Sequence, residues 1–130
     1  MTREPTPPPA PRVLLIDADA AFARFVATTL RLEGAAVDVA ATGTQGLELA
    51  EREPPDLILL ELLLPDMSGE AVLRRLRAGP AAAVPVVVVS IVGDLTQIEA
   101  LRALGVTDVF TKPVAASALV TAVRRALANR

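Results

Sequence analysis

The sequence lacks two residue types on which much protein chemistry depends, because it contains no cysteine and no histidine. Without cysteine there is no disulfide framework, no thiol chemistry and no cysteine-based zinc site. Without histidine there is neither an imidazole base nor a histidine metal ligand. Aromatic residues are also scarce, with three Phe and no Tyr or Trp. Candidate chemistry therefore has to be sought among other side chains, and carboxylates come first.

Strong net charge and long apolar runs are absent too. The formal net charge of −2 gives no general attraction to nucleic acid or to anionic lipid. No stretch reaches the roughly 18 apolar residues of a membrane span, and the N-terminus lacks the apolar core of a signal peptide. We therefore expect a cytoplasmic protein that uses neither nucleic acid nor a membrane as a partner. Its 130 residues, 52% of them hydrophobic, suffice for one domain with its own core.

Lysine is nearly absent, since the basic residues comprise twelve Arg and a single Lys, Lys112. It stands in the tripeptide Thr111-Lys112-Pro113. A compact ammonium fits a tight pocket in a way that a guanidinium fork does not. The lone lysine is therefore a candidate site residue.

The first eleven residues differ from the rest of the chain, because five of them are proline. Such a segment has little capacity to fold. We predict an extended tail over residues 1–11 and a folded domain over residues 12–130.

Short apolar runs and amphipathic segments alternate through the domain. Thr42 and Gln45 have the spacing of a capping box, and Ser68 stands where it can cap the next helix. In the first helix the apolar face is predicted to contain Phe22 and Phe25, with Val26 and Thr29 at the same spacings. The predicted strands are Arg12–Asp17, Ala36–Ala40, Asp56–Glu61, Val84–Ser90 and Val106–Thr111, and the predicted helices are Ala20–Glu33, Thr44–Arg52, Gly69–Arg77, Leu95–Leu104 and Ala115–Asn129.

Five strands alternating with five helices favour a parallel sheet covered on both sides. In such folds the carboxyl ends of the strands form one edge, where functional sites lie. Asp17, Glu61, Ser90 and Lys112 follow or end four of the five predicted strands. Each could be a helix cap or a solvated side chain when taken alone, but their joint occurrence predicts one shared site. Glu61 stands out, because a carboxylate closing an apolar run needs a partner or a purpose.

These segments resemble the receiver domain of two-component response regulators over about residues 12–129. The resemblance implies a flavodoxin-like (βα)5 three-layer sandwich with strand order 2-1-3-4-5, and a signalling module rather than an enzyme. Receivers accept a phosphoryl group from a histidine kinase on an Asp after the third strand. An acidic pair holds a divalent metal, and a Ser or Thr and a Lys contact the phosphoryl group. The matching segments are Val13-Leu-Leu-Ile-Asp17-Ala-Asp19, Pro55-Asp-Leu-Ile-Leu-Leu-Glu61, Leu64-Pro65-Asp-Met-Ser-Gly69, Pro85-Val-Val-Val-Val-Ser90 and Thr111-Lys112-Pro113.

The resemblance also implies that this site is only half present. Asp17, Ser90 and Lys112 match the family pattern, and Pro113 matches a proline that is cis in the family. Glu61 takes the position of the phosphoacceptor Asp. Ala18 falls where the second metal-binding carboxylate belongs, and Ile91 falls where a small residue is common. Val109 replaces the usual aromatic switch residue.

These departures affect metal binding and phosphoryl transfer together. Mg²⁺ is usually bound through carboxylates and phosphate. Because Ala18 removes one of these carboxylates, no metal site is expected, and Asp17 and Asp19 are only weak candidate ligands. Asp19 is instead expected to cap the first helix. Glu exceeds Asp by one methylene, about 1.5 Å, and in-line transfer is sensitive to displacements of about 1 Å. The extra reach brings Glu61 toward Lys112, in a pair expected to neutralise the pocket. Glu61 is then either an imitation of the phosphorylated state or a plain ion pair.

We therefore predict a degenerate receiver that binds partner proteins without phosphorylation and without a cofactor. One alternative is a working phosphoacceptor that uses Glu61 or another residue, with Mg²⁺ held by Asp17 and Asp19. Another is a flavodoxin-like module for a small ligand, against which stand the missing Gly-rich loop and the missing stacking aromatics. The expected partners are a histidine kinase or an output protein, and a homodimer is possible. The candidate interaction surface, by analogy with the family, contains Leu95, Arg102, Val109 and Arg124.

Overall fold

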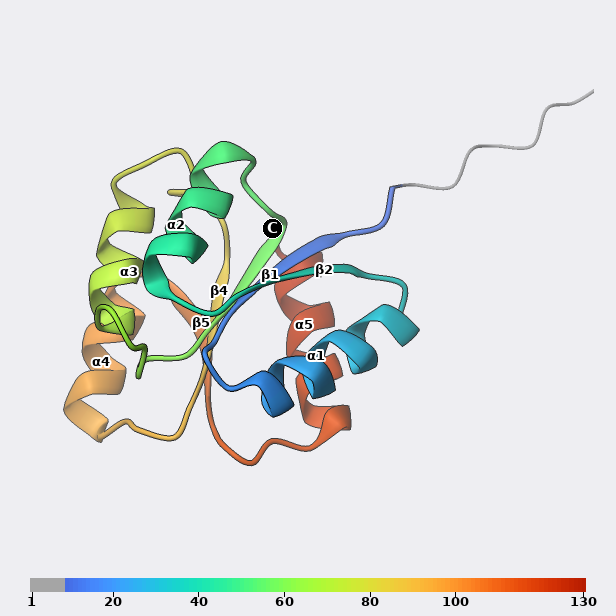
Figure 1. Ribbon diagram of the computed structural model, residues 1–130. Helices are drawn as coiled ribbons and strands as arrows, with labels where there is room; N and C mark the ends of the chain where they lie inside the picture. The colour runs from blue at the N-terminus through green and yellow to red at the C-terminus, as the bar shows by residue number, and fades with distance from the viewer. Residues whose placement is uncertain (1–8) are drawn as a thin grey trace, which may run out of the picture.

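The computed structural model describes residues 9–130, apart from the side chain of Leu95, and consists of a five-stranded sheet between two layers of helices (Figure 1). Most of the predicted tail lies outside the described residues, so its extended conformation stays a prediction. The elements are β1 (Arg12–Ile16), α1 (Ala20–Leu32), β2 (Ala36–Ala40), α2 (Gly43–Arg52), β3 (Leu57–Leu60), α3 (Gly69–Arg77), β4 (Val86–Ser90), α4 (Leu95–Ala103), β5 (Val106–Thr111) and α5 (Ala116–Ala128).

The strand order is β2-β1-β3-β4-β5 and every neighbouring pair is parallel, which confirms the predicted flavodoxin-like topology. The strands β3 and β4 are buried along their whole length. Their continuous apolar sequences follow from this burial, because helices cover both faces of a parallel sheet.

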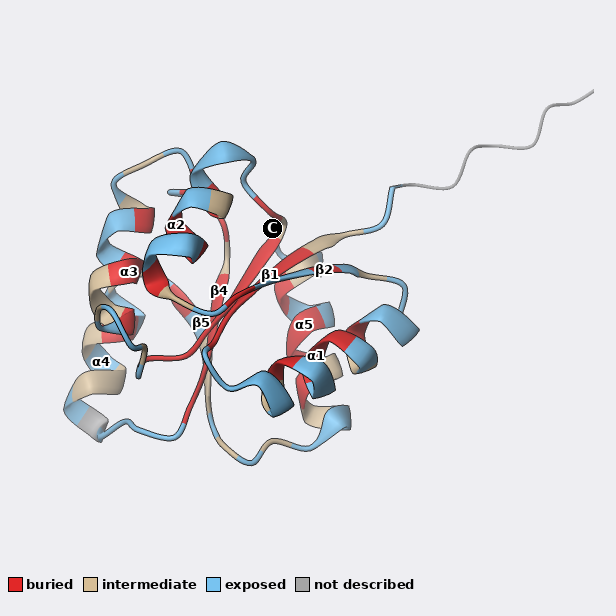
Figure 2. Cartoon of the chain, in the orientation of Figure 1, coloured by how far each residue is buried: buried red, intermediate tan, exposed pale blue. Residues whose placement is uncertain are grey.

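Two apolar clusters lie on opposite faces of the sheet, and Figure 2 shows buried residues along the central strands and in helices of both layers. Successive strand residues alternate between them, because side chains along a strand point to opposite faces. In β3, Ile58 and Leu60 belong to the cluster beneath α2, α3 and α4, whereas Leu57 and Leu59 belong to the cluster beneath α1 and α5. No helix within residues 9–130 is long and apolar enough to cross a membrane.

The predicted helix caps are confirmed at α2 and α3. The Thr42 hydroxyl accepts from the Gln45 amide at 3.1 Å, and the Ser68 hydroxyl accepts from the Ala71 amide at 3.1 Å. The Gln45 side chain accepts from the amide of Ala41 at 3.0 Å. In the usual capping box this side chain accepts from the amide of the N-cap residue itself, whereas here it accepts from the amide of the residue before it.

The prediction that Phe25 lies on the buried face of α1 is wrong, because this side chain remains 36% exposed. The helix instead contacts the core through Ala23, Val26, Ala27 and Leu30. Ala23 and Ala27 belong to the buried cluster on this face of the sheet, whereas the ring of Phe25 lies 6.0 Å from that of Phe22, centroid to centroid. The strands β1 and β3 also end one residue earlier than predicted, so that Asp17 and Glu61 stand just beyond them.

An irregularity in β5 sets the position of the segment that follows it. Val86 pairs with Val106, but its neighbour Val87 pairs with Asp108, so Thr107 is an extra residue in β5. Such bulges often re-aim side chains near functional sites. This one places Thr111 opposite Ser90, directly before Lys112 and its cis peptide bond to Pro113.

Candidate functional site at the carboxyl edge of the sheet

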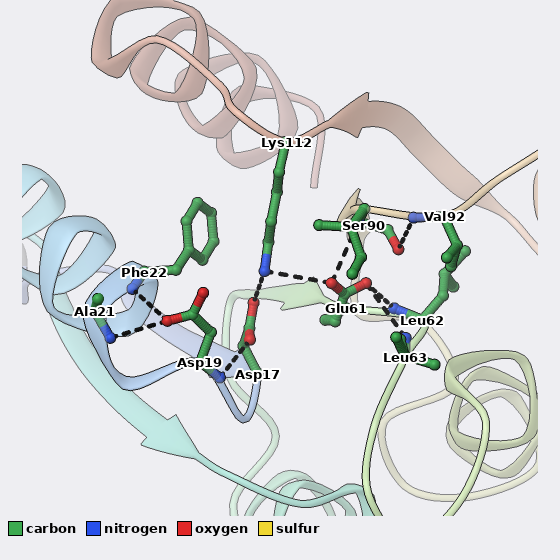
Figure 3. A network of polar contacts seen from close by, with 11 residues as sticks. Asp17, Asp19, Ala21, Phe22, Glu61, Leu62, Leu63, Ser90, Val92 and Lys112 are labelled. Atoms are coloured by element: carbon green, nitrogen blue, oxygen red, sulfur yellow. Dashed lines mark hydrogen bonds and ion pairs between the residues drawn. The ribbon is translucent and has the colours of Figure 1, made fainter.

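The four polar residues predicted to share a site do converge, at the edge formed by the carboxyl ends of β1, β3, β4 and β5 (Figure 3). Backbone hydrogen bonds continue past the strand ends and fix three of them. The amide of Asp17 donates to Ala40, that of Glu61 to Ile16 and that of Lys112 to Ser90, over 2.9 to 3.0 Å. The site is therefore held by the sheet itself.

Lys112 extends its ammonium group between two buried carboxylates. Its Nζ atom lies 2.8 Å from Oδ2 of Asp17 and 3.3 Å from Oε1 of Glu61. Asp17 and Glu61 are each only 3% exposed. The predicted Glu61–Lys112 pair is thus confirmed, but the expectation of a neutral pocket is wrong, because Asp17 shares the same ammonium. The three groups together carry a formal charge of −1.

The carboxylate of Glu61 is turned back onto backbone amides of its own loop and of the next one. Oε2 accepts from the amides of Leu62 at 2.6 Å and Leu63 at 3.3 Å, and Oε1 accepts from Ile91 at 3.4 Å. Burial raises the pKa of Glu61, but a hydrogen bond with Ser90, the amides of Leu63 and Leu62 and the charge of Lys112 outweigh it and lower the pKa below its usual value of 4.5. Glu61 is therefore a stable carboxylate without any phosphoryl group.

Burial lowers the pKa of Lys112, but the hydrogen bonds and charges of Asp17 and Glu61 dominate and raise it above 10.5. The ring of Phe22 also contacts this ammonium, since Nζ lies 4.2 Å from the ring centroid in a cation–π contact. Phe22 is a site residue that the sequence pattern missed. The available signal was its place in the first turn of the helix that directly follows the Asp17 strand.

The carboxylates do not fit a divalent cation. Asp17 uses Oδ1 to accept from the amide of Asp19 and Oδ2 to accept from Lys112. Asp19 caps α1, as expected, by accepting from the amides of Ala21 and Phe22. Residues 9–130 contain no group of three or more acidic side chains spaced to hold a metal. Magnesium prefers near-octahedral oxygen coordination, and here it would have to displace an ammonium and do without a ligand at Ala18.

The residues predicted for the interaction surface separate in space. Arg102 on α4 is exposed, and Val109 on β5 is half-buried against the cluster beneath α4. Arg124 pairs with Glu33, the C-cap residue of α1, so it lies on the α1 side of α5 and away from that surface. Arg125 is the α5 arginine that faces β5, with its NH1 atom 3.6 Å from Asp108. The side chain of Leu95 lies outside the described part.

A second carboxylate near the site, Asp66, was not singled out from the sequence. It accepts from the amides of Gly43 and Thr44 at 2.8 and 2.9 Å, and from the Thr44 hydroxyl at 2.6 Å. These contacts lower the pKa of Asp66 from 3.8 to about 2, the Thr44 hydroxyl contributing most. The loop that follows Glu61 is thereby tied to the N-terminus of α2.

Comparison with known proteins places these observations in a family context. The family model described as the response regulator receiver domain matches residues 13–124. The DNA-binding response regulator MtrA of Mycolicibacterium paratuberculosis is 37% identical over 116 residues, which are 89% of this chain and 51% of that protein. The DNA-binding dual master transcriptional regulator RpaA of Synechocystis is 35% identical over 119 residues, 90% of this chain and 49% of that protein. The chain thus spans about half the length of these curated relatives.

Solved structures agree with the sequence comparison. A CheY-like response regulator receiver domain protein from Methanospirillum hungatei superposes with a TM-score of 0.88 at 27% identity, over 92% of this chain and 95% of that one. The receiver domain of the Francisella response regulator 1452 gives a TM-score of 0.83 at 28% identity, over 92% and 98% of the two chains.

Proposed function

The chain belongs to the response regulator receiver domain family, and on this premise we propose that it acts as a receiver that signals through protein contacts without phosphorylation of an aspartate. The observation that carries the proposal is the Lys112 ammonium between Asp17 and Glu61, at 2.8 and 3.3 Å. In this arrangement the position of the acceptor is already occupied by an ionised group with its own counter-ion.

Three features of the site support this function. Ala18 supplies no metal ligand, and Asp19 is engaged in capping α1. Glu61 is longer than the usual acceptor and is bound by the amides of its own loop, so its oxygens are not presented for in-line attack. The half-buried Val109 has no ring with which to report a change in the pocket.

We propose that the partners are signalling proteins, either a histidine kinase or an output protein. The surface formed by α4, β5 and α5 remains the candidate, with Arg102 and Val109 on it. A groove of about 310 Å³ runs along α5 on this side, and its lining includes Phe110, Thr121 and Arg125. Homodimerisation and a cytoplasmic location stay predictions.

A direct test compares the response to a phosphoryl mimic. The chain and its Ala18→Asp/Glu61→Asp variant are each mixed with Mg²⁺ and beryllofluoride, and amide spectra are recorded. We expect no specific shifts around Glu61 in the natural sequence and clear shifts in the variant, because the variant restores the acceptor and the metal ligand. Mg²⁺-dependent shifts in the unaltered chain would instead support the phosphoaccepting alternative.

A further inference from the structure

Exposed apolar side chains occur on the two loops whose amides bind the Glu61 carboxylate. Three of the six exposed large apolar side chains in the described part are Leu63, Ile91 and Val92, with 58%, 61% and 40% of their surface accessible. We call these three residues the apolar rim. Leu63 comes from the loop after β3, and the other two come from the loop after β4. Apolar side chains that cluster on a surface commonly mark an interaction site.

The apolar rim is coupled to the pocket through its backbone. The amides of Leu63 and Ile91 donate to the Glu61 carboxylate at 3.3 and 3.4 Å, and the amide of Val92 donates to the Ser90 hydroxyl at 3.1 Å (Figure 3). A partner that covers these three side chains would therefore rest on the loops whose amides hold Glu61 and Ser90 in place.

The charges around the apolar rim determine what kind of partner fits. The loops that follow the five strands contain five carboxylates and one ammonium, a formal charge of −4, and none of the twelve arginines. The arginines instead occupy other positions, among them the last turn of every helix. The five carboxylates are those of Asp17, Asp19, Glu61, Asp66 and Asp94.

From this combination we propose that the apolar rim binds a segment of a partner protein in which leucine-like side chains alternate with Lys or Arg. The apolar side chains would cover Leu63, Ile91 and Val92, and the cations would meet Asp19 and Asp94, the caps of α1 and α4. An acidic segment, a nucleic acid or an anionic membrane would be repelled by the same loops. The inference rests on the proposed function, since a pocket that turns over phosphate would need to stay open to water and to a phosphodonor.

The test uses a phage-displayed library of random 12-residue peptides, selected on the immobilised 130-residue chain. The leading peptide is then synthesised, and its affinity is measured by fluorescence anisotropy at two salt concentrations. The rim variant is Leu63→Ser/Ile91→Ser. The charge variant is Asp19→Asn/Asp94→Asn, because asparagine keeps a helix cap while removing its charge. Leu32→Ser on α1 and Arg52→Ala on α2 are controls, since Leu32 is 83% exposed, Arg52 is also exposed, and both residues lie on helices outside these loops.

We expect enriched peptides that combine Lys or Arg with Leu, Ile or Phe. The rim variant should weaken binding by about tenfold or more, as the loss of buried leucine-sized area implies. The charge variant should weaken binding and flatten its salt dependence, and both controls should bind like the unaltered chain.

The proposal is overturned if no peptide is enriched, if the enriched peptides are acidic, or if binding is insensitive to the rim variant. It is also overturned if the rim proves to be the contact between two copies of this chain. A phosphoryl adduct at Glu61 would refute the proposed function and would leave a rim-dependent peptide affinity standing, so the two failures are distinguishable.

Discussion

The Nζ atom of Lys112 lies 2.8 Å from Oδ2 of Asp17, which is closer than its 3.3 Å distance from Oε1 of Glu61. One ammonium therefore serves two carboxylates, in a pocket that water hardly reaches. The three charges are therefore not equivalent. Removing the Lys112 cation would leave two buried negative charges, whereas removing either carboxylate would leave one cation paired with one anion.

The first prediction concerns this asymmetry. Lys112→Met should lower the free energy of unfolding at neutral pH by about 3–5 kcal/mol, the usual cost of leaving buried charge uncompensated. Urea unfolding followed by circular dichroism measures it. The triple variant Asp17→Asn/Glu61→Gln/Lys112→Met should recover most of the loss, because it removes all three charges. A loss below about 1 kcal/mol in the single variant, the range of a surface pair, would show that the network is not desolvated.

The second prediction concerns the chemical reactivity of the only lysine. An amine-selective acylating reagent attacks the neutral amine, and the raised pKa of Lys112 keeps that form rare. At limiting reagent we expect acylation at the N-terminal amine only, as located by peptide mass mapping. Glu61→Gln should make Lys112 more reactive, because it removes one of the two charges that hold the proton. Equal labelling of both amines in the unaltered chain would contradict the ion-pair geometry.

The third prediction is the pH dependence of stability. The pKa of Glu61 is lower in the folded chain than its ordinary value of 4.5, so its contribution is complete above 4.5 and is lost as the pH falls through the folded value. The pKa of Lys112 is raised above 10.5, so its contribution is complete below 10.5 and is lost as the pH rises through the folded value. Unfolding free energies along an acid series should therefore fall more steeply for the unaltered chain than for Glu61→Gln. Parallel curves would refute the assignment.

The fourth prediction concerns Asp66 and α2. Asp66→Asn keeps one acceptor oxygen but loses the charge and one of the hydrogen-bond acceptors at the start of α2. We expect the amides of Gly43 and Thr44 to exchange with solvent faster by hydrogen-exchange NMR, and the core strands to be unaffected. Asp38→Asn is the control, because Asp38 is an exposed residue of β2. In the unaltered chain the cap should persist under acid until the pH approaches about 2.

The topology could be predicted from the sequence because short apolar runs alternate with amphipathic helical segments along the chain. The runs at 57–60 and 86–89 are apolar throughout, which is typical of strands buried on both faces. The capping residues Thr42 and Ser68 marked two helix starts. Because parallel strands have their carboxyl ends at one edge of the sheet, Asp17, Glu61 and Lys112 could be placed together from the order of the elements alone.

What the sequence could not supply was the orientation of side chains within that edge. The bulge at Thr107 changes the register of β5 and thereby the placement of Lys112, and no local pattern marks it. The helical spacing places Phe22 on the apolar face of α1, but it does not show that the ring also lies over the ammonium of Lys112. The position of Arg124 beside Glu33 depends on how α5 is rotated against α1, which periodicity alone does not fix.

The central claim is that Glu61, held with Asp17 by the Lys112 ammonium, does not accept a phosphoryl group. The measurement that tests it most directly is the intact mass of the chain after incubation with Mg²⁺ and a small phosphodonor such as acetyl phosphate, beside Ala18→Asp/Glu61→Asp treated identically. We predict an unchanged mass for the unaltered chain and a phosphoryl adduct on the double variant. An adduct on the unaltered chain that disappears in Glu61→Gln would contradict the account.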